Sequence, residues 1–104
     1  MSIVKIKAKN LKTYKEKTFG LAFRKTPLTV YFDTIFGIHT FGVKFPIDVL
    51  ILDNNFNVKK VKKNLSPCRF FFWNIKYSKV IEAPSGTISK NSIKIGDKIE
   101  IEYI

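Results

Sequence analysis

Residues 38–53 read Ile-His-Thr-Phe-Gly-Val-Lys-Phe-Pro-Ile-Asp-Val-Leu-Ile-Leu-Asp. Within this stretch, 47–52 is almost wholly apolar, which predicts a strand buried on both faces. Pro46 precedes it at a position where a strand tolerates a missing amide donor. Asp48 interrupts the apolar run near its start, and a buried carboxylate is costly without a partner. The stretch therefore predicts a central strand in which one carboxylate marks a structural junction or a site.

The sequence on either side predicts a hairpin and two half-exposed strands. Asp53-Asn54-Asn55 has the composition of a turn, after which 56–61 is expected to return as a bulged or twisted hairpin partner. Apolar and charged residues alternate over 3–9 and again over 98–104, as in strands with one face in water. Further strands are expected at 28–32, 38–41, 69–73 and 79–83.

The composition agrees with a mainly β fold. Isoleucine, valine and phenylalanine, which suit the pleated surface of a sheet, are abundant. Thr13 and Glu16 have capping-box spacing and predict a short helix near 14–23, and a helical turn is expected near 87–91. No linker, repeat or low-complexity tract divides the chain, so residues 1–104 are expected to form one domain. We predict a compact, rolled or coiled, antiparallel-rich β-sheet or small barrel with one short helix and one helical turn.

The net charge of +11 attracts phosphates and anionic surfaces. Lysine supplies 17 of the 19 basic residues, however, whereas phosphate and base recognition favours the planar guanidinium of arginine. The clustered lysines at 59, 60, 62 and 63 have two interpretations. They protect a solvated strand edge from aggregation, or they belong to a nucleic-acid-binding surface.

Cysteine usage and apolar run length predict a cytoplasmic protein. Cys68 is the single cysteine, so the chain cannot form an internal disulfide, and a reducing compartment is expected. The N-terminal sequence lacks the apolar core of a signal peptide, and charged residues interrupt every longer apolar run. We expect no membrane association and a monomer or weak dimer.

Five ordered motifs resemble a known family. They are Gly20-Leu21-Ala22-Phe23-Arg24, His39-Thr40-Phe41-Gly42, Phe45-Pro46-Ile47-Asp48, Val80-Ile81-Glu82-Ala83-Pro84-Ser85-Gly86-Thr87 and Gly96-Asp97. Through them, most of the chain resembles the domain of unknown function 192 family of archaea and bacteria. The resemblance implies a small domain of coiled and bent β-sheets, and it implies no reaction.

The chain departs from the family pattern at a few positions. Ala22 and Val43 stand where the family usually has methionine, and these exchanges keep the apolar character and should leave the fold intact. Many bacterial relatives carry tryptophan where this chain has His39. That difference argues against an indispensable catalytic imidazole at this position.

His39 and Asp48 each have a structural and a functional interpretation. His39 is either a general base, because imidazole titrates near neutrality, or a packed ring bonded to the backbone. A lone histidine without a second ligand at metal-binding spacing is poor evidence for a metal, and no metal or cofactor is expected. Asp48 either forms a bidentate ion pair with Arg24 that ties the helix to the central strand, or faces a cleft.

Glu82 and the aromatic run 69–73 leave similar alternatives open. Glu82 either faces water beside Lys79 or forms, with Asp48, a carboxylate pair suited to a hydroxyl-rich ligand or a cation. Arg69-Phe70-Phe71-Phe72-Trp73 combines one cation with four aromatic rings. Because alternate side chains of a strand face opposite ways, one pair of rings should fill the core. The other pair is either covered as well or forms an exposed platform.

The leading functional hypothesis is a non-enzymatic domain that binds a small ligand or a protein partner in a cleft. The candidate contact residues are Arg24, His39, Asp48, Glu82, Arg69 and Trp73. A second hypothesis is a nucleic-acid-binding accessory protein that uses the lysine field and Trp73. A third is a hydrolase-like enzyme in which His39 acts with Asp48 or Glu82. No phosphate-binding or dinucleotide-binding glycine pattern occurs, so nucleotide-driven catalysis is not expected.

Overall fold

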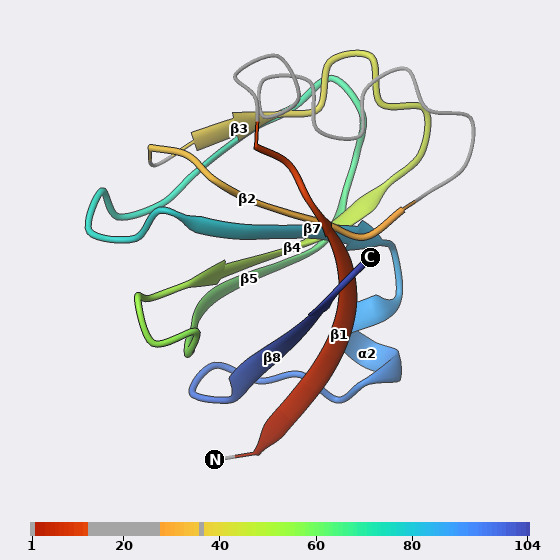
Figure 1. Cartoon of the computed structure of the whole chain (residues 1–104). Helices are drawn as coiled ribbons and strands as arrows, with labels where there is room; N and C mark the ends of the chain where they lie inside the picture. The colour runs from red at the N-terminus through yellow and green to blue at the C-terminus, as the bar shows by residue number, and fades with distance from the viewer. Residues whose placement is uncertain (1, 13–27, 36) are drawn as a thin grey trace.

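The computed structural model describes residues 2–12, 28–35 and 37–104. Its main element is a six-stranded sheet with the strand order β5-β4-β7-β2-β1-β8 (Figure 1). The strands are β1 (Ile3–Asn10), β2 (Val30–Asp33), β4 (Ile47–Leu52), β5 (Val58–Leu65), β7 (Lys79–Pro84) and β8 (Lys98–Tyr103). A second sheet consists of β3 (Gly37–His39) and β6 (Phe70–Phe72), and one helical turn, α2 (Thr87–Lys90), follows β7. The predicted mainly β, rolled architecture is thus confirmed.

The apolar run 47–52 forms the strand β4, as the sequence predicts. β4 pairs antiparallel with β5 on one side and β7 on the other, and all six of its residues are buried. Ile47, Val49 and Ile51 pack into a cluster on the face that also holds Trp73. Leu50 and Leu52 pack on the opposite face, in a cluster that includes residues of α2 and β8. We call the face that holds Trp73 the β6 side and the opposite face the α2 side.

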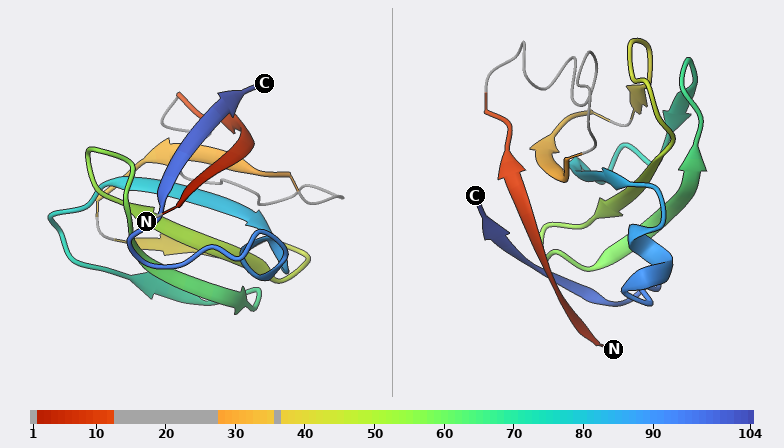
Figure 2. Two further views of the ribbon diagram at one scale, coloured as in Figure 1. Left: turned by 90° about the horizontal axis from the view of Figure 1, so that it is seen from below. Right: turned by 90° about the vertical axis from the view of Figure 1, so that its right-hand side faces the viewer.

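β1 has parallel neighbours on both sides, which the sequence analysis did not predict. It pairs in parallel with β8 and with β2, whereas the other strand pairings are antiparallel. The first and last strands therefore lie side by side (Figure 2). Parallel neighbours require long connections, and alternation within one strand does not specify the direction of its partner.

The six-stranded sheet curls into a half-barrel. Its edge strands approach each other at one end, where Asn57 and Lys98 form an antiparallel bridge. Next to this bridge, the N–H of Ile99 donates to the carbonyl of Phe56 at 2.9 Å. Beyond that contact β8 diverges from β5, and the half-barrel stays open (Figure 2).

Two further predicted elements are the helix near 14–23 and the hairpin partner of β4. The helix expected near 14–23 lies outside the described residues, as does Arg24. The hairpin partner of β4 is confirmed, although it extends from Val58 to Leu65 rather than over 56–61. One register shift, between Val58 and Lys60, falls where the sequence suggested irregularity, and a second, between Lys62 and Leu65, does not. No helix in the described part of the chain is long and apolar enough to cross a bilayer.

Candidate functional site

The Asp48 carboxylate lies buried where three segments meet, with 1 % of the residue exposed. Its Oδ1 accepts a hydrogen bond from the N–H of Asn64 at 3.0 Å. Its Oδ2 accepts from the N–H of Gly86 at 3.1 Å and from the N–H of Ile88 at 2.9 Å. Main-chain donors thus compensate the burial of the carboxylate, and Asp48 does not face a cleft.

Asp48 lies opposite a bulge in β5. The register pairs on either side of it are Ile47–Leu65 and Val49–Lys62, so two residues of β5, 63 and 64, stand opposite Asp48. Asn64 has a φ of +54°, a left-handed conformation that asparagine tolerates better than most residues. This conformation turns the N–H of Asn64 away from the β4–β5 pairing, and the carboxylate of Asp48 accepts a hydrogen bond from it.

The other oxygen of Asp48 bonds the start of α2. The N-cap residue Gly86 has a φ of +96° and offers no side chain to cap the helical turn. Asp48 supplies the missing acceptor from β4. The hydroxyl of Ser85 donates to the side-chain oxygen of Asn64, which joins the bulge to the same turn. We name Asp48, Asn64, Ser85, Gly86 and Ile88 the Asp48 junction.

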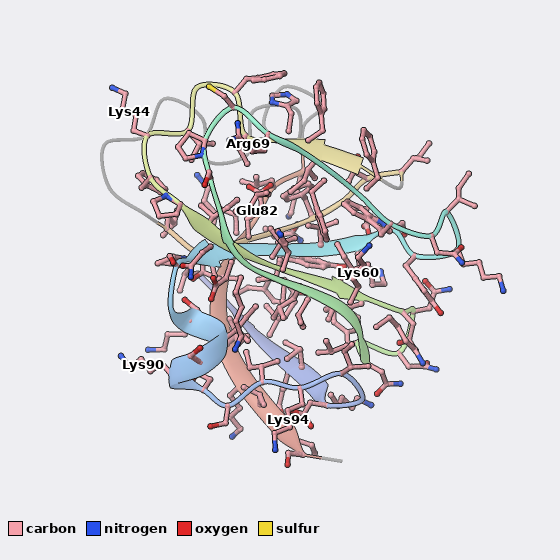
Figure 3. All side chains as sticks on the ribbon, turned by 180° about the vertical axis from the view of Figure 1, so that it is seen from behind. Lys44, Lys60, Arg69, Glu82, Lys90 and Lys94 are labelled. Carbon is pink, nitrogen blue, oxygen red and sulfur yellow. The ribbon has the colours of Figure 1, made fainter. Side chains whose placement is uncertain are left out.

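Glu82 and Asp48 lie on opposite faces of the six-stranded sheet. Asp48 is the register partner of Ala83, and Glu82 is the register partner of Val49. Because side chains alternate along a strand, Glu82 shares the β6 side with Val49, whereas Asp48 faces the α2 side. Glu82 is 3 % exposed and lies within the molecule (Figure 3). The structure therefore does not bring these two carboxylates together as a pair.

His39 ends β3 on the side of the sheet away from Asp48. Its ring lies against that of Phe41, with centroids 5.2 Å apart and an angle of 26° between the planes. Its Nδ1 accepts a hydrogen bond from the N–H of Phe41 at 3.3 Å. A ring nitrogen that accepts a hydrogen bond carries no proton, so the proton of the neutral ring is assigned to Nε2. The structure does not join His39 to Asp48 as an acid–base pair.

Thr40 is a residue that the sequence analysis missed. It is fully buried, and its N–H donates to the carbonyl of Arg69 at 2.9 Å. Its hydroxyl accepts from the N–H of Arg69 at 2.8 Å and donates to the carbonyl of Ser66 at 2.8 Å. Thr40 thereby fixes the start of β6 against the end of β3. A small polar residue inside the motif at 39–42 was the signal that could have indicated it.

Phe70 and Phe72 form an exposed aromatic platform on β6. Phe70 is 61 % exposed and Phe72 is 54 % exposed, and their rings stack with centroids 5.8 Å apart and 10° between the planes. The ring of Phe41 meets that of Phe70 edge-on at 5.0 Å. Of the two arrangements considered for this strand, the structure shows the exposed platform. We name His39, Phe41, Phe70 and Phe72 the aromatic surface.

Trp73 belongs to the core rather than to the aromatic surface. It is 7 % exposed, and its Nε1–H donates to the carbonyl of Tyr77 at 2.6 Å. The structure thus places Trp73, a candidate contact residue from the sequence, away from the exposed rings. Alternation along β6 turns Trp73 and Phe71 toward the six-stranded sheet and leaves Phe70 and Phe72 outside.

Gly37 allows Phe72 to lie flat against β3. A Cβ at Gly37 would approach Cδ1 of Phe72 to 2.6 Å, so a larger residue would displace the ring. A shallow hollow of about 220 Å³ lies here, lined by Ile35, Gly37, Ile38, His39, Phe70 and Phe72. The glycine thus helps to set the position of the platform.

Basic residues flank the aromatic surface. Between Asn54 and Ile81 the sequence holds seven lysine or arginine residues and no aspartate or glutamate. Nζ of Lys60 donates to the carbonyl of Phe72 at 3.1 Å. Lys62 and Arg69 line a hollow of about 280 Å³ that adjoins Phe70. Figure 3 shows Arg69 and Lys44 at the end of the molecule away from Lys90 and Lys94.

The described residues contain no group of three or more histidine, cysteine, aspartate or glutamate side chains placed to hold a metal ion. The exposed part of this region offers ring faces and cations. A curled half-barrel that carries a small two-stranded sheet with an outward aromatic surface is the class of protein that this fold and surface define.

The chain belongs to the domain of unknown function 192 family. The family model, described as Uncharacterized ACR, matches residues 2–101 and confirms the resemblance seen in the sequence. A comparison with curated proteins gives no significant match.

Two solved structures share the fold. A protein of unknown function from Novosphingobium aromaticivorans DSM 12444 superposes with a TM-score of 0.74 at 20 % sequence identity, over 90 % of this chain and 71 % of its own. A protein from Sinorhizobium meliloti 1021, described as a putative transcription regulator, gives a TM-score of 0.74 at 14 % identity, over 90 % of this chain and 76 % of its own. At these identities the likeness concerns the fold alone.

Proposed function

We propose that this chain is a non-enzymatic domain that binds single-stranded nucleic acid through the aromatic surface and the cations beside it. The observation that carries the proposal is the exposed, stacked pair Phe70 and Phe72 next to Lys60, Lys62 and Arg69. Every base has a π face, so exposed rings accept bases without reading their sequence, while neighbouring cations follow the phosphates.

The charge distribution favours a polyanion over a protein partner or a small apolar ligand. An exposed apolar patch by itself fits any of the three. Here, however, the segment that carries the platform holds seven cations and no acidic residue. Two acidic residues next to this segment pair with its lysines, since Asp33 lies 3.5 Å from Nζ of Lys79 and Asp53 lies 3.8 Å from Nζ of Lys59, and the other five cations lie outside these two pairs.

The other functional hypotheses lose the support that they drew from Asp48. A ligand-binding cleft at Asp48 has no support, because main-chain amides surround that carboxylate. A hydrolase that uses His39 with Asp48 has no support either, because Asp48 lies across the sheet from His39. A small ligand or a protein partner on the aromatic surface is the second candidate.

Binding of a fluorescent single strand of about 12 nucleotides, compared with a duplex of the same length, tests the proposal by anisotropy. We expect a preference for the single strand and an affinity that falls as salt rises, with a log–log slope of about −0.7 for each phosphate neutralised. Phe72→Leu should weaken binding about tenfold, because one base stack contributes roughly 1–3 kcal/mol.

Matched controls separate stacking from general attraction between charges. Tyr103→Leu removes a ring that is also 54 % exposed, but from β8, and should leave affinity unchanged. The double variant Lys60→Gln, Lys62→Gln should bind less tightly than the double variant Lys90→Gln, Lys94→Gln. If Phe72→Leu has no effect and both lysine pairs act equally, binding is general polyanion attraction and the proposed surface is wrong.

A further inference from the structure

One edge of β8 bonds β1, and the other edge is largely open. The N–H of Lys98 donates to the carbonyl of Ser2, just before β1, at 2.8 Å, and the N–H of Ile104 donates to the carbonyl of Ala8 in β1 at 3.1 Å, so the even-numbered residues here face β1. The N–H of Ile99 points the other way and donates to the carbonyl of Phe56 across the closed end of the half-barrel. Main-chain groups alternate between the two edges of a strand, so the odd-numbered residues share the direction of Ile99.

Ile101 and Tyr103 therefore present their N–H and C=O groups on the edge away from β1. In the described part of the chain, neither residue forms a main-chain hydrogen bond on that edge. Unpaired groups in this arrangement form a template onto which another extended segment can pair. Tyr103 is exposed and Ile101 is half-buried.

A groove of about 560 Å³ runs along this open edge. One wall is formed by Ile99, Ile101 and Tyr103, and the other by the turn at 54–56. The rings of Phe56 and Tyr103 both pack against Tyr31, with centroids 5.7 Å and 6.2 Å away, so residues of both walls rest on one core side chain. The groove occupies the opening of the half-barrel, where an added strand would continue the sheet.

The side chains of β8 indicate what such a strand should carry. On the edge that is already paired, Lys5 is the register partner of Glu100, and Lys7 is the register partner of Glu102. The apolar residues of β1 alternate with these lysines. A second neighbour of β8 would meet the same alternation of isoleucine and glutamate, because both edges present the same side chains.

We propose that β8 takes up an extended peptide in which apolar and basic residues alternate, paired to the main chain of Ile101 and Tyr103. A second copy of this chain fits less well, because antiparallel pairing of two β8 strands about Ile101 sets Glu100 of one copy against Glu102 of the other. The groove shares no residue with the aromatic surface, so this peptide site is separate from the proposed nucleic-acid site.

An acetylated Val-Lys-Val-Lys-Val-Lys peptide is the probe, and amide hydrogen exchange followed by NMR is the measurement. At saturating peptide, exchange at Ile101 and Tyr103 should slow at least tenfold, whereas Glu100 and Glu102, already bonded to β1, should not change. A Val-Glu-Val-Glu-Val-Glu peptide should bind at least tenfold more weakly. The double variant Glu100→Gln, Glu102→Gln should bind the lysine peptide less tightly.

Two probes that are N-methylated at alternate residues test whether binding uses the main chain. Only one of them blocks the amides that face β8, so their affinities should differ at least tenfold. Equal affinities, or unchanged exchange at Ile101 and Tyr103, would overturn the proposal. Slow exchange at these residues that depends on protein concentration without peptide would show a second copy on the edge and would also overturn it.

Discussion

The Asp48 junction and the aromatic surface each include residues of the stretch 38–53 but contrast in burial. Asp48 is a charge that is 1 % exposed, and three main-chain donors satisfy it. Phe70 and Phe72 are apolar rings that are more than half exposed. A buried charge with all its hydrogen bonds indicates a role in stability, whereas an uncovered aromatic cluster indicates an interaction.

The largest expected effect is at Asp48, where Asp48→Asn should lower the free energy of unfolding by about 3 kcal/mol. The side-chain amide keeps the shape, but its NH₂ group must face a main-chain N–H, and a buried unsatisfied donor costs roughly 1–3 kcal/mol, more where a charged acceptor is lost. Urea unfolding followed by circular dichroism measures the change. Oligonucleotide affinity of the folded variant should stay that of the wild type.

Asp33→Asn is the matched control for this prediction. Asp33 has a half-exposed side chain and pairs with Lys79 at 3.5 Å, so its loss should cost less than about 1 kcal/mol. An unfolding midpoint of Asp48→Asn equal to that of Asp33→Asn would contradict the structural role of the Asp48 junction.

Thr40→Val should have the next largest effect and should change stability and binding together. The variant keeps the volume but removes the hydroxyl that bonds Ser66 and Arg69, at a cost of about 2 kcal/mol. Since Thr40 fixes the start of β6, oligonucleotide affinity should fall as well. Thr40→Ser, which keeps the hydroxyl, should keep both the stability and the oligonucleotide affinity near those of the wild type. A valine variant with wild-type stability and affinity would show that the hydroxyl does not organise the surface.

Phe70→Leu should change the unfolding free energy by less than about 0.5 kcal/mol, as for other exposed positions. The same substitution at the neighbouring Phe71, which packs toward the core, should cost about 1.5 kcal/mol. Oligonucleotide affinity should show the opposite order, with the larger loss at Phe70. Thermal unfolding and anisotropy on the two variants measure the pair, and equal effects at both positions would remove the contrast between the faces of β6.

The smallest expected effect concerns Asp97, a second carboxylate bonded to main-chain amides. Hydrogen bonds from the N–H of Lys94 and then of Ser2 hold the pKa of Asp97 below its usual range. A folded-state pKa that is depressed gives stability above the unfolded pKa of about 3.9, and this stability is lost as the pH falls through the folded value. The difference in urea midpoint between pH 6 and pH 3 should therefore be smaller in Asp97→Asn. If the variant and the wild type show the same difference in urea midpoint, the lowered pKa of Asp97 does not contribute to the pH dependence of stability.

Local patterns predicted the elements well. The apolar run gave β4 its bounds, and the alternation at 98–104 gave β8 within one residue. The partner of Asp48 could not be predicted in the same way. The sequence suggested Arg24, which lies outside the described residues, whereas the observed donors are amides of Asn64, Gly86 and Ile88. Every residue other than proline carries such an amide, so no sequence pattern marks the ones that a carboxylate will meet.

The aromatic run 69–73 is a second case in which the sequence did not decide how the side chains are placed. Strand alternation indicated that Phe70 and Phe72 share one face and that Phe71 and Trp73 share the other. It did not indicate which pair is covered. That depends on which pair packs against the β6 side of the six-stranded sheet, and the strands of that sheet come from distant parts of the sequence. Trp73 was therefore named as a candidate contact residue, although its N–H is bonded inside the molecule.

By itself the sequence determined a mainly β domain, the position of its central strand, the excess of positive charge and the family. These properties are set by composition and by periodicity over a few residues, which need no knowledge of distant contacts. Only the tertiary structure decided that Asp48 joins three segments, that Glu82 lies across the sheet from it and that two phenylalanines stay exposed. Each of these depends on strand order, register and face, which are fixed by contacts between residues far apart in the chain.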